Sequence, residues 1–145
     1  MADGKLTIDD GKRALSEHAV DKAFEIRERY GDNIDYDGVL KLLQDTDFVR
    51  FPTTVTFGSL EDPGLFAITN PISEDPSDGY SIQVSQRYED RHDLLPALIL
   101  YHLVTVNYGD FANADDAEKF GAAVLGMPQE SYYNLLCSIV DGLFY

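Results

Sequence analysis

The first third of the chain places hydrophobic residues at the spacing of amphipathic helices. A surface helix is predicted from Asp9 or Asp10 to Tyr30, just before Gly31. Its apolar positions recur every three or four residues, at Leu15, Ala19, Ala23 and Ile26. A shorter helix is predicted from residue 35 to residue 44, and its apolar face is formed by Tyr36, Val39, Leu40 and Leu43.

After residue 45 the apolar residues fall at every second position, which is typical of strands. The segment "DFVRFPTTVTF" predicts a strand, although Pro52 favours an edge position or a break. A second short strand is predicted from Leu65 to Ile68. The segment "YSIQVSQ" predicts a third, with Tyr80, Ile82 and Val84 on the buried face and Ser81, Gln83 and Ser85 on the exposed face. We expect these strands to form an antiparallel sheet with one buried face.

The last third of the chain predicts three helices. The first begins at Leu94, is capped by Asp93 and ends before Gly109. It is apolar on nearly all sides, so we expect it to be buried. The second starts at residue 113 or 115 and the third follows Pro128. This order of elements predicts a single α+β domain, residues 1–145, in which a small three-stranded antiparallel sheet packs against about five helices.

Two details of these helices carry structural expectations. Gly121 interrupts an apolar helical stripe, which indicates the close approach of another backbone. The acidic pairs Asp9-Asp10 and Asp115-Asp116 stand at helix starts, where carboxylates act as caps more often than as ligands of a hard cation.

The composition is unusually acidic. The 145 residues include 26 acidic and 11 basic ones, for a net charge of -15. Such a chain repels phosphates and anionic lipids, so nucleic acid and membrane surfaces are not expected partners. Three interpretations remain: adaptation to high salt, as in haloarchaeal proteins, a docking surface for a basic partner, or mimicry of nucleic acid. The acids are spread along the chain rather than gathered in one block, which favours adaptation to high salt.

The remaining sequence features predict a soluble cytoplasmic protein. Cys137 is the single cysteine, so no internal disulfide is possible, and its apolar helical surroundings predict a buried, inert thiol. The N-terminal segment lacks the apolar run of a signal peptide, and no apolar stretch reaches membrane-spanning length. Nucleotide-binding, serine-hydrolase and paired-cysteine motifs are absent, and no cofactor is predicted.

The segments "GYSIQVS", "RYEDRHDLLPALILYHL" and "DDAEKFGAAVLGM" follow one another, and together they resemble the minimal zincin-type metallopeptidases. In that family an edge strand precedes the helix that carries HExxH, and the next helix carries an acidic residue before an Ala-x-x-Phe-Ala pattern. Ala117, Phe120 and Gly121 stand in that pattern here. The resemblance covers roughly residues 48–128, and it implies a zincin-like fold.

The catalytic motif of the family is missing. In HExxH the two histidines grip one zinc ion and the glutamate deprotonates the bound water. Aligned on His102, the first histidine position is Leu98 and the glutamate position is Ile99, and neither can do this chemistry. The third ligand of the family would come from Asp115, Asp116 or Glu118. The resemblance therefore implies a fold without peptidase activity, and we predict no catalytic residue and no metal ligand.

The best candidate binding residues lie in and after the apolar helix. They are Tyr101, His102, Asn107, Tyr108 and Asp110 in "YHLVTVNYGDF", with Asp116 and Glu118 of the next helix. Tyr101 and Tyr108 are seven residues apart and hence nearly on one helix face. A structural alternative remains open, in which His102 is a hydrogen-bonded core residue and the "NYGD" segment only ends the helix.

These observations predict a binding or regulatory role. The resemblance implies that an extended protein or peptide partner adds to an exposed sheet edge, so substitutions near Ser81, Gln83 and Ser85 should weaken its capture. The alternative is an atypical metal-dependent hydrolase that uses His102 and carboxylates of the following helix. A third hypothesis is self-association through the aromatic C-terminal helix, whose relevant residues are Tyr132, Tyr133, Phe144 and Tyr145.

Overall fold

The hydrophobic pattern anticipates every α-helix and strand of the α+β structure within the part of the chain that is described, but not three short 3-10 helices. The computed structural model describes residues 7–62 and 64–142, apart from the side chains of Asp9 and Asp110. The elements are α1 (Ile8–Tyr30), α2 (Tyr36–Leu42), β1 (Thr53–Gly58), β2 (Ala67–Pro71), β3 (Tyr80–Ser85), α3 (Leu95–Tyr108), α4 (Ala114–Leu125) and α5 (Gln129–Val140).

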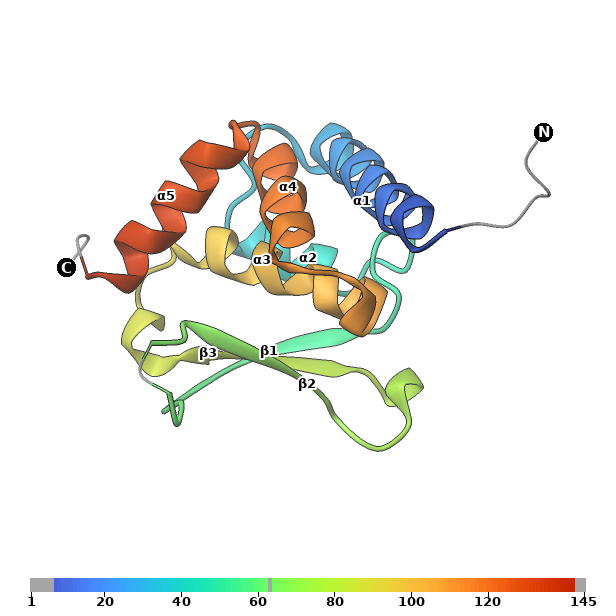
Figure 1. The fold of residues 1–145 in the computed structure, drawn as a ribbon. Coiled ribbons are helices and arrows are strands. Elements are labelled where there is room, and N and C mark those ends of the chain that lie inside the picture. The colour runs from blue at the N-terminus through green and yellow to red at the C-terminus, as the bar shows by residue number, and fades with distance from the viewer. Residues whose placement is uncertain (1–6, 63, 143–145) are drawn as a thin grey trace, which may run out of the picture.

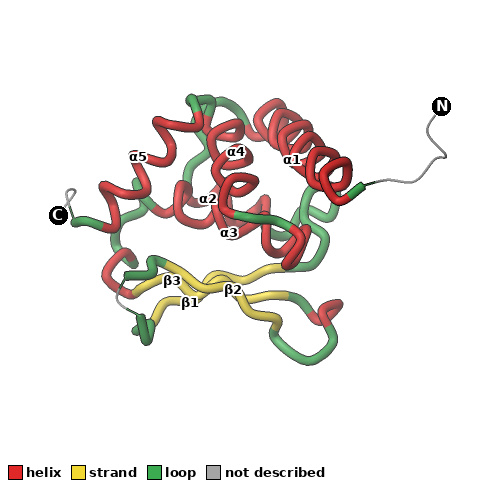
Figure 2. The backbone as a smooth tube through the Cα atoms, in the orientation of Figure 1, coloured by secondary structure: helices red, strands yellow, loops and turns green. Residues whose placement is uncertain are grey.

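The elements form three layers (Figure 1). The sheet is the lowest layer, α2 and α3 cross one of its faces, and α1, α4 and α5 form the upper layer. The tube in Figure 2 shows that no helix of the described residues covers the opposite face of the sheet. No helix within the described ranges is both long enough and apolar enough to cross a membrane.

The sheet is mixed, so the prediction of a purely antiparallel sheet was wrong. The strand order is β1-β3-β2, in which β3 runs parallel to β1 and antiparallel to β2. Alternation of side chains determines which face of a strand is buried, but it does not determine which strand lies beside it. The predicted buried face of β3 is confirmed at Ile82 and Val84, which are fully buried. Tyr80, predicted on the same face, is only partly buried, as are Ser81, Gln83 and Ser85 of the other face.

This strand order also corrects the expected place of partner binding. The strand that precedes the long apolar helix was expected at an edge of the sheet, by resemblance to the zincin-type peptidases. In the structure that strand is β3, which is paired on both sides. A partner therefore cannot add a strand to it. The two edges of the sheet are β1 and β2.

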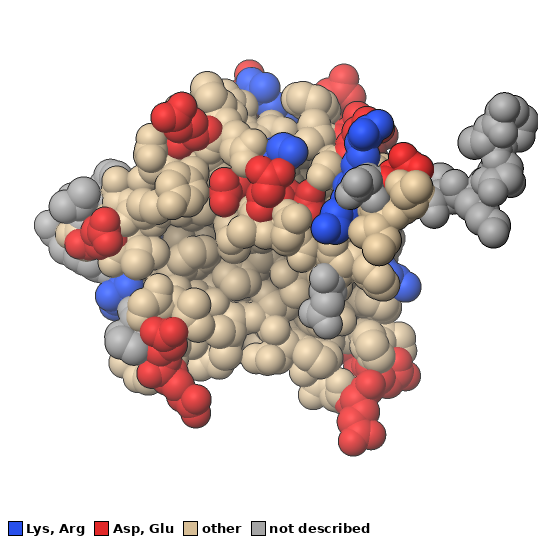
Figure 3. Space-filling view, viewed as in Figure 1, with Lys and Arg blue, Asp and Glu red and all other residues tan. Residues whose placement is uncertain are grey.

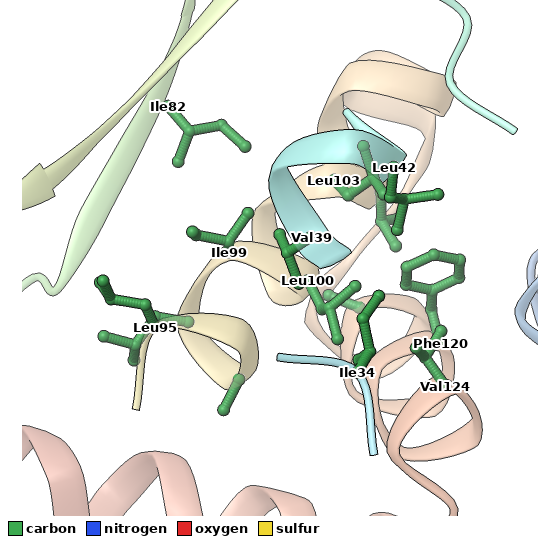
Figure 4. Close-up of a cluster of buried hydrophobic side chains, with 14 of the residues drawn as sticks. Ile34, Val39, Leu42, Ile82, Leu95, Ile99, Leu100, Leu103, Phe120 and Val124 are labelled. Atoms are coloured by element: carbon green, nitrogen blue, oxygen red, sulfur yellow. The ribbon is translucent and has the colours of Figure 1, made fainter. Parts of the chain in front are cut away.

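Helix α3 is the centre of the core, as its apolar sequence predicts. Figure 4 shows Leu95, Ile99, Leu100 and Leu103 of α3 between Ile82 of the sheet, Val39 and Leu42 of α2, and Phe120 and Val124 of α4. All of these side chains are fully buried. Full burial of a Leu or Ile side chain stabilises the fold by roughly 1.5–3 kcal/mol. Helix α3 therefore holds the layers together through hydrophobic contact.

The predicted caps are confirmed at two helices and wrong at a third. Asp10 and Asp116 each occupy the third position of a capping box, with Thr7 and Asn113 as the N-caps. At α3, however, the N-cap is Leu94, which makes no side-chain cap, and the neighbouring Asp93 pairs with Arg91 instead. An arginine two residues away competes well for a carboxylate, and Pro96 leaves α3 one fewer backbone N–H to satisfy.

Candidate functional site

The structure separates the seven predicted binding residues into distinct places. His102 faces strand β2, Asn107 holds the loop before β1, Tyr108 and Asp116 contact α1, and Tyr101 and Glu118 line a pocket beside α5. Asp110 lies in a short turn after α3, and its side chain is outside the described residues. The six residues whose side chains are described therefore lie in four separate places and do not form one site.

His102 is a largely buried histidine with a protein partner. Its Nδ1 lies 3.0 Å from the Thr69 hydroxyl on β2, and its ring contacts that of Phe66 edge to face. Burial lowers the pKa of His102 to about 4, so the imidazole is neutral near neutral pH. These contacts match the structural alternative, in which His102 is a hydrogen-bonded core residue.

Asn107 fastens the loop between α2 and β1 to the core helix. Its side-chain nitrogen donates to the Phe48 carbonyl at 2.9 Å, and its side-chain oxygen accepts from the Arg50 N–H at 2.8 Å. The residue is 8% exposed. Both ends of the amide are thus occupied by backbone, and Asn107 is not available to a ligand.

Tyr108 and Asp116 belong to a polar contact between three helices. The Tyr108 hydroxyl lies 2.6 Å from His18 Nδ1 on α1, and burial raises the pKa of Tyr108 to about 12. The Ser16 hydroxyl, also on α1, donates to the carboxylate of Asp116. Asp116 is buried and serves its own helix cap, so this cluster joins α1 to α3 and α4.

The described residues bring no metal site together. No group of three or more His, Cys, Asp or Glu side chains among them is placed to hold a metal ion. Leu98 and Ile99, which align with the missing histidine and glutamate of HExxH, are fully buried.

Tyr101 of α3 and Glu118 of α4 line a pocket of about 270 Å³, together with Phe66, just before β2, and residues of α5. The rings of Phe66, Tyr101 and Tyr133 form aromatic walls, and the centroids of Phe66 and Tyr101 are 5.6 Å apart in an edge-to-face arrangement. The carboxylates of Glu118 and Asp141 complete the polar lining. The pocket is mostly apolar with a few polar groups, which is typical of ligand sites.

Sequence reasoning missed most of this pocket. Its remaining wall comes from one face of α5, where Tyr133 and Cys137 are four residues apart, as are Leu136 and Val140. That spacing was visible in the sequence and places these residues on neighbouring positions of the helix surface, but it does not show that Phe66, Tyr101 and Glu118 lie opposite them. Cys137 was predicted to be buried, whereas its side chain is only partly buried and lines the pocket.

The self-association hypothesis loses one of its residues. Tyr132 is fully buried, and its hydroxyl donates to the Ala97 carbonyl at 2.5 Å. Tyr133 is 51% exposed, while Phe144 and Tyr145 lie outside the described residues.

The edge of β1 is a second candidate site. The bond from the Tyr80 N–H to the Pro52 carbonyl shows that even-numbered residues of this segment face β3, so Thr53, Val55 and Phe57 direct their backbone groups outward. Thr53 is occupied, because its N–H donates to the Leu43 carbonyl and its carbonyl accepts from Gln44. Within the described part of the chain, the N–H and C=O of Val55 and Phe57 have no hydrogen-bond partner.

The edge of β2 offers fewer free groups. By the same reasoning, Ala67, Thr69 and Pro71 direct their backbone groups away from β3. Pro71 has no N–H, and Ala67 is only 3% exposed. Proline on an edge strand is a common protection against strand addition, so β1 is the more available edge.

Comparisons with known proteins give no match: no protein-family model, no curated protein and no solved structure is significantly similar to the chain.

Proposed function

We propose that this protein is a non-catalytic, zincin-like binding module that captures an extended peptide at the free edge of β1. The observation that carries the proposal is the pair of outward-facing residues Val55 and Phe57, whose backbone groups are unpaired in the described structure. Together they present two donors and two acceptors at the spacing that an added strand requires.

The composition of β1 supports this role. Sheet edges that must not pair are usually protected by charged side chains, proline or a bulge. The strand "TTVTFG" contains no charged residue and no proline, although the whole chain has a net charge of -15. The side chains of Val55 and Phe57 are only partly buried, so an added strand would cover apolar surface as well as make hydrogen bonds.

The open face of the sheet also supports peptide capture at β1. Its side chains come from Thr54, Thr56, Ile68, Asn70, Ser81, Gln83 and Ser85, and none of them is charged. A strand added to β1 would extend this face without placing a partner against carboxylates. The substitutions predicted at Ser81, Gln83 and Ser85 lie on β3, so they would act one strand away from the bound peptide, across β1.

The non-catalytic part of the proposal rests on the core. Leu98 and Ile99 fill the positions of two catalytic side chains, and His102 is engaged by Thr69. Metal content by mass spectrometry, before and after zinc is added to untagged protein, tests this part. One tightly held zinc ion per chain, lost in His102→Ala, would support the metal-dependent hydrolase instead.

Proline substitution tests the binding edge. Peptides selected from a displayed random library would be measured against the wild type, Val55→Pro and Phe57→Pro. Each substitution removes an outward N–H but no bond to β3, so the fold should persist while affinity falls at least about tenfold. Thr69→Pro is the corresponding control on β2; it also removes the hydroxyl that contacts His102, so its folding is checked by the unfolding temperature, and it should bind normally. Equal binding by wild type and both β1 variants would refute strand addition at this edge.

A further inference from the structure

We infer that the aromatic pocket between β2 and α5 binds the guanidinium group of an arginine side chain presented by a partner. This pocket has a lining separate from the β1 edge, so the inference does not depend on the proposed function. It rests on three features of the lining: aromatic walls, two carboxylates, and the lack of any basic side chain.

The aromatic walls provide the first feature. Phe66 and Tyr101 meet at an interplanar angle of 75°, so the two rings form a corner rather than a flat stack. Tyr133 adds a third ring and is half exposed, which leaves the pocket open to solvent. The face of an aromatic ring attracts a cation, and a planar guanidinium can also stack upon it.

The two carboxylates provide the second feature. Glu118 is partly buried and accepts one bond, of 3.3 Å, from Gln129, while Asp141 is exposed. Neither carboxylate forms an ion pair with any described residue. Lys119, the cation next to Glu118 in the sequence, is bound to Asp115 instead. The negative charge of Glu118 also helps to raise the pKa of Tyr101, after the larger effect of burial. The pocket therefore holds negative charge that nothing in the described structure neutralises.

The lack of basic residues provides the third feature. Among the described residues, no Lys, Arg or His lines the pocket. Figure 3 shows one face of the molecule, where acidic and basic residues stand around the margins and in the upper middle, and a broad area below them carries neither. An anionic ligand would find no counter-charge among the described residues of the pocket. A cation that is apolar along its stem and planar at its head fits both the rings and the carboxylates, and arginine has this chemistry.

Two probes that differ in charge but hardly in shape provide the test. Acetyl-arginine methylamide and acetyl-citrulline methylamide would be titrated into ¹⁵N-labelled protein at low and moderate salt. We expect saturable shifts at the amides of Tyr133, Leu136 and Cys137 with the arginine probe only, weakening as salt increases. Free agmatine, which lacks the peptide groups, shows whether the side chain alone is sufficient.

Matched variants complete the experiment. Glu118→Gln keeps the bond to Gln129 but removes the charge. This variant should bind the arginine probe at least about fivefold more weakly. Glu28→Gln removes the same charge from exposed α1 and should leave the affinity unchanged. Tyr101→Leu should also weaken binding, with folding checked by the unfolding temperature. Equal binding of the citrulline probe, or an unaffected Glu118→Gln variant, would overturn the inference, whatever the outcome at β1.

Discussion

The ring of Tyr132 lies so close to Gly121 that a β-carbon on residue 121 would stand 2.3 Å from a ring atom. The glycine was expected to admit another backbone, and instead it admits an aromatic side chain from α5. Through this gap the Tyr132 hydroxyl reaches α3, where it donates to the Ala97 carbonyl. Three helices are thus joined at one point.

Gly121→Ala is therefore expected to destabilise the fold. Alanine normally favours a helix over glycine by about 1 kcal/mol, but overpacking in a core costs typically about 1–3 kcal/mol. The clash involves a fully buried ring with little room to move, so we expect a net loss of about 1–2 kcal/mol in urea unfolding. Gly11→Ala is the control, because Gly11 lies in α1 and a β-carbon added there would have no atom within 4 Å, so this variant should be more stable than the wild type. A stabilising Gly121→Ala would contradict the packing described.

Asn107→Ala is expected to loosen the loop before β1. The substitution leaves the Phe48 carbonyl and the Arg50 N–H without their partner, at a cost of about 1–3 kcal/mol. Asn70→Ala, on the exposed part of β2, should change the free energy of unfolding by less than about 0.5 kcal/mol. If both variants unfold at the same denaturant concentration, the loop is not held by Asn107.

The stability of the protein should depend on His102 between pH 7 and pH 4. Burial lowers the pKa of folded His102 from 6.5 to about 4, so the unfolded chain binds a proton more readily than the folded one over this range. The stability associated with neutral His102 is present above pH 6.5 and is lost as the pH falls through the folded pKa of about 4, by roughly 3 kcal/mol in total.

The measurement compares unfolding free energies of the wild type and His102→Leu across that range. Their difference should change steadily in favour of the variant as the pH falls, because leucine has no proton to bind. His92→Gln is the control, since His92 is exposed. A difference that stays constant from pH 7 to pH 4 would mean that His102 titrates alike in the folded and unfolded chain.

The fold followed from the sequence wherever one segment carried its own signal. The apolar stripe of α1 at Ala19, Ala23 and Ile26 is fully buried, and Gly109 ends α3 as expected. The pairing of the strands could not be predicted from the sequence. Strand β3 inserts between β1 and β2, and the alternation of its side chains would be the same in any strand order.

Helical spacing alone also could not predict what the candidate site residues contact. Tyr101 and Tyr108 are seven residues apart and so were expected on one helix face, but two helical turns separate them by about 10 Å along the axis. Tyr101 therefore meets the pocket beside α5, while Tyr108 meets His18 on α1. Shared periodicity identifies a face, and only the neighbouring elements decide what each residue on that face contacts.

Hydrogen exchange at the four central amides of β1 reports directly on whether a peptide is captured at this edge. In the free protein the amides of Thr54 and Thr56, which face β3, should be protected, while those of Val55 and Phe57 should exchange fast. With a saturating library-selected peptide, the amides of Val55 and Phe57 should become protected as well. Fast exchange at both positions in the saturated complex, with new protection elsewhere, would contradict capture of a strand at this edge.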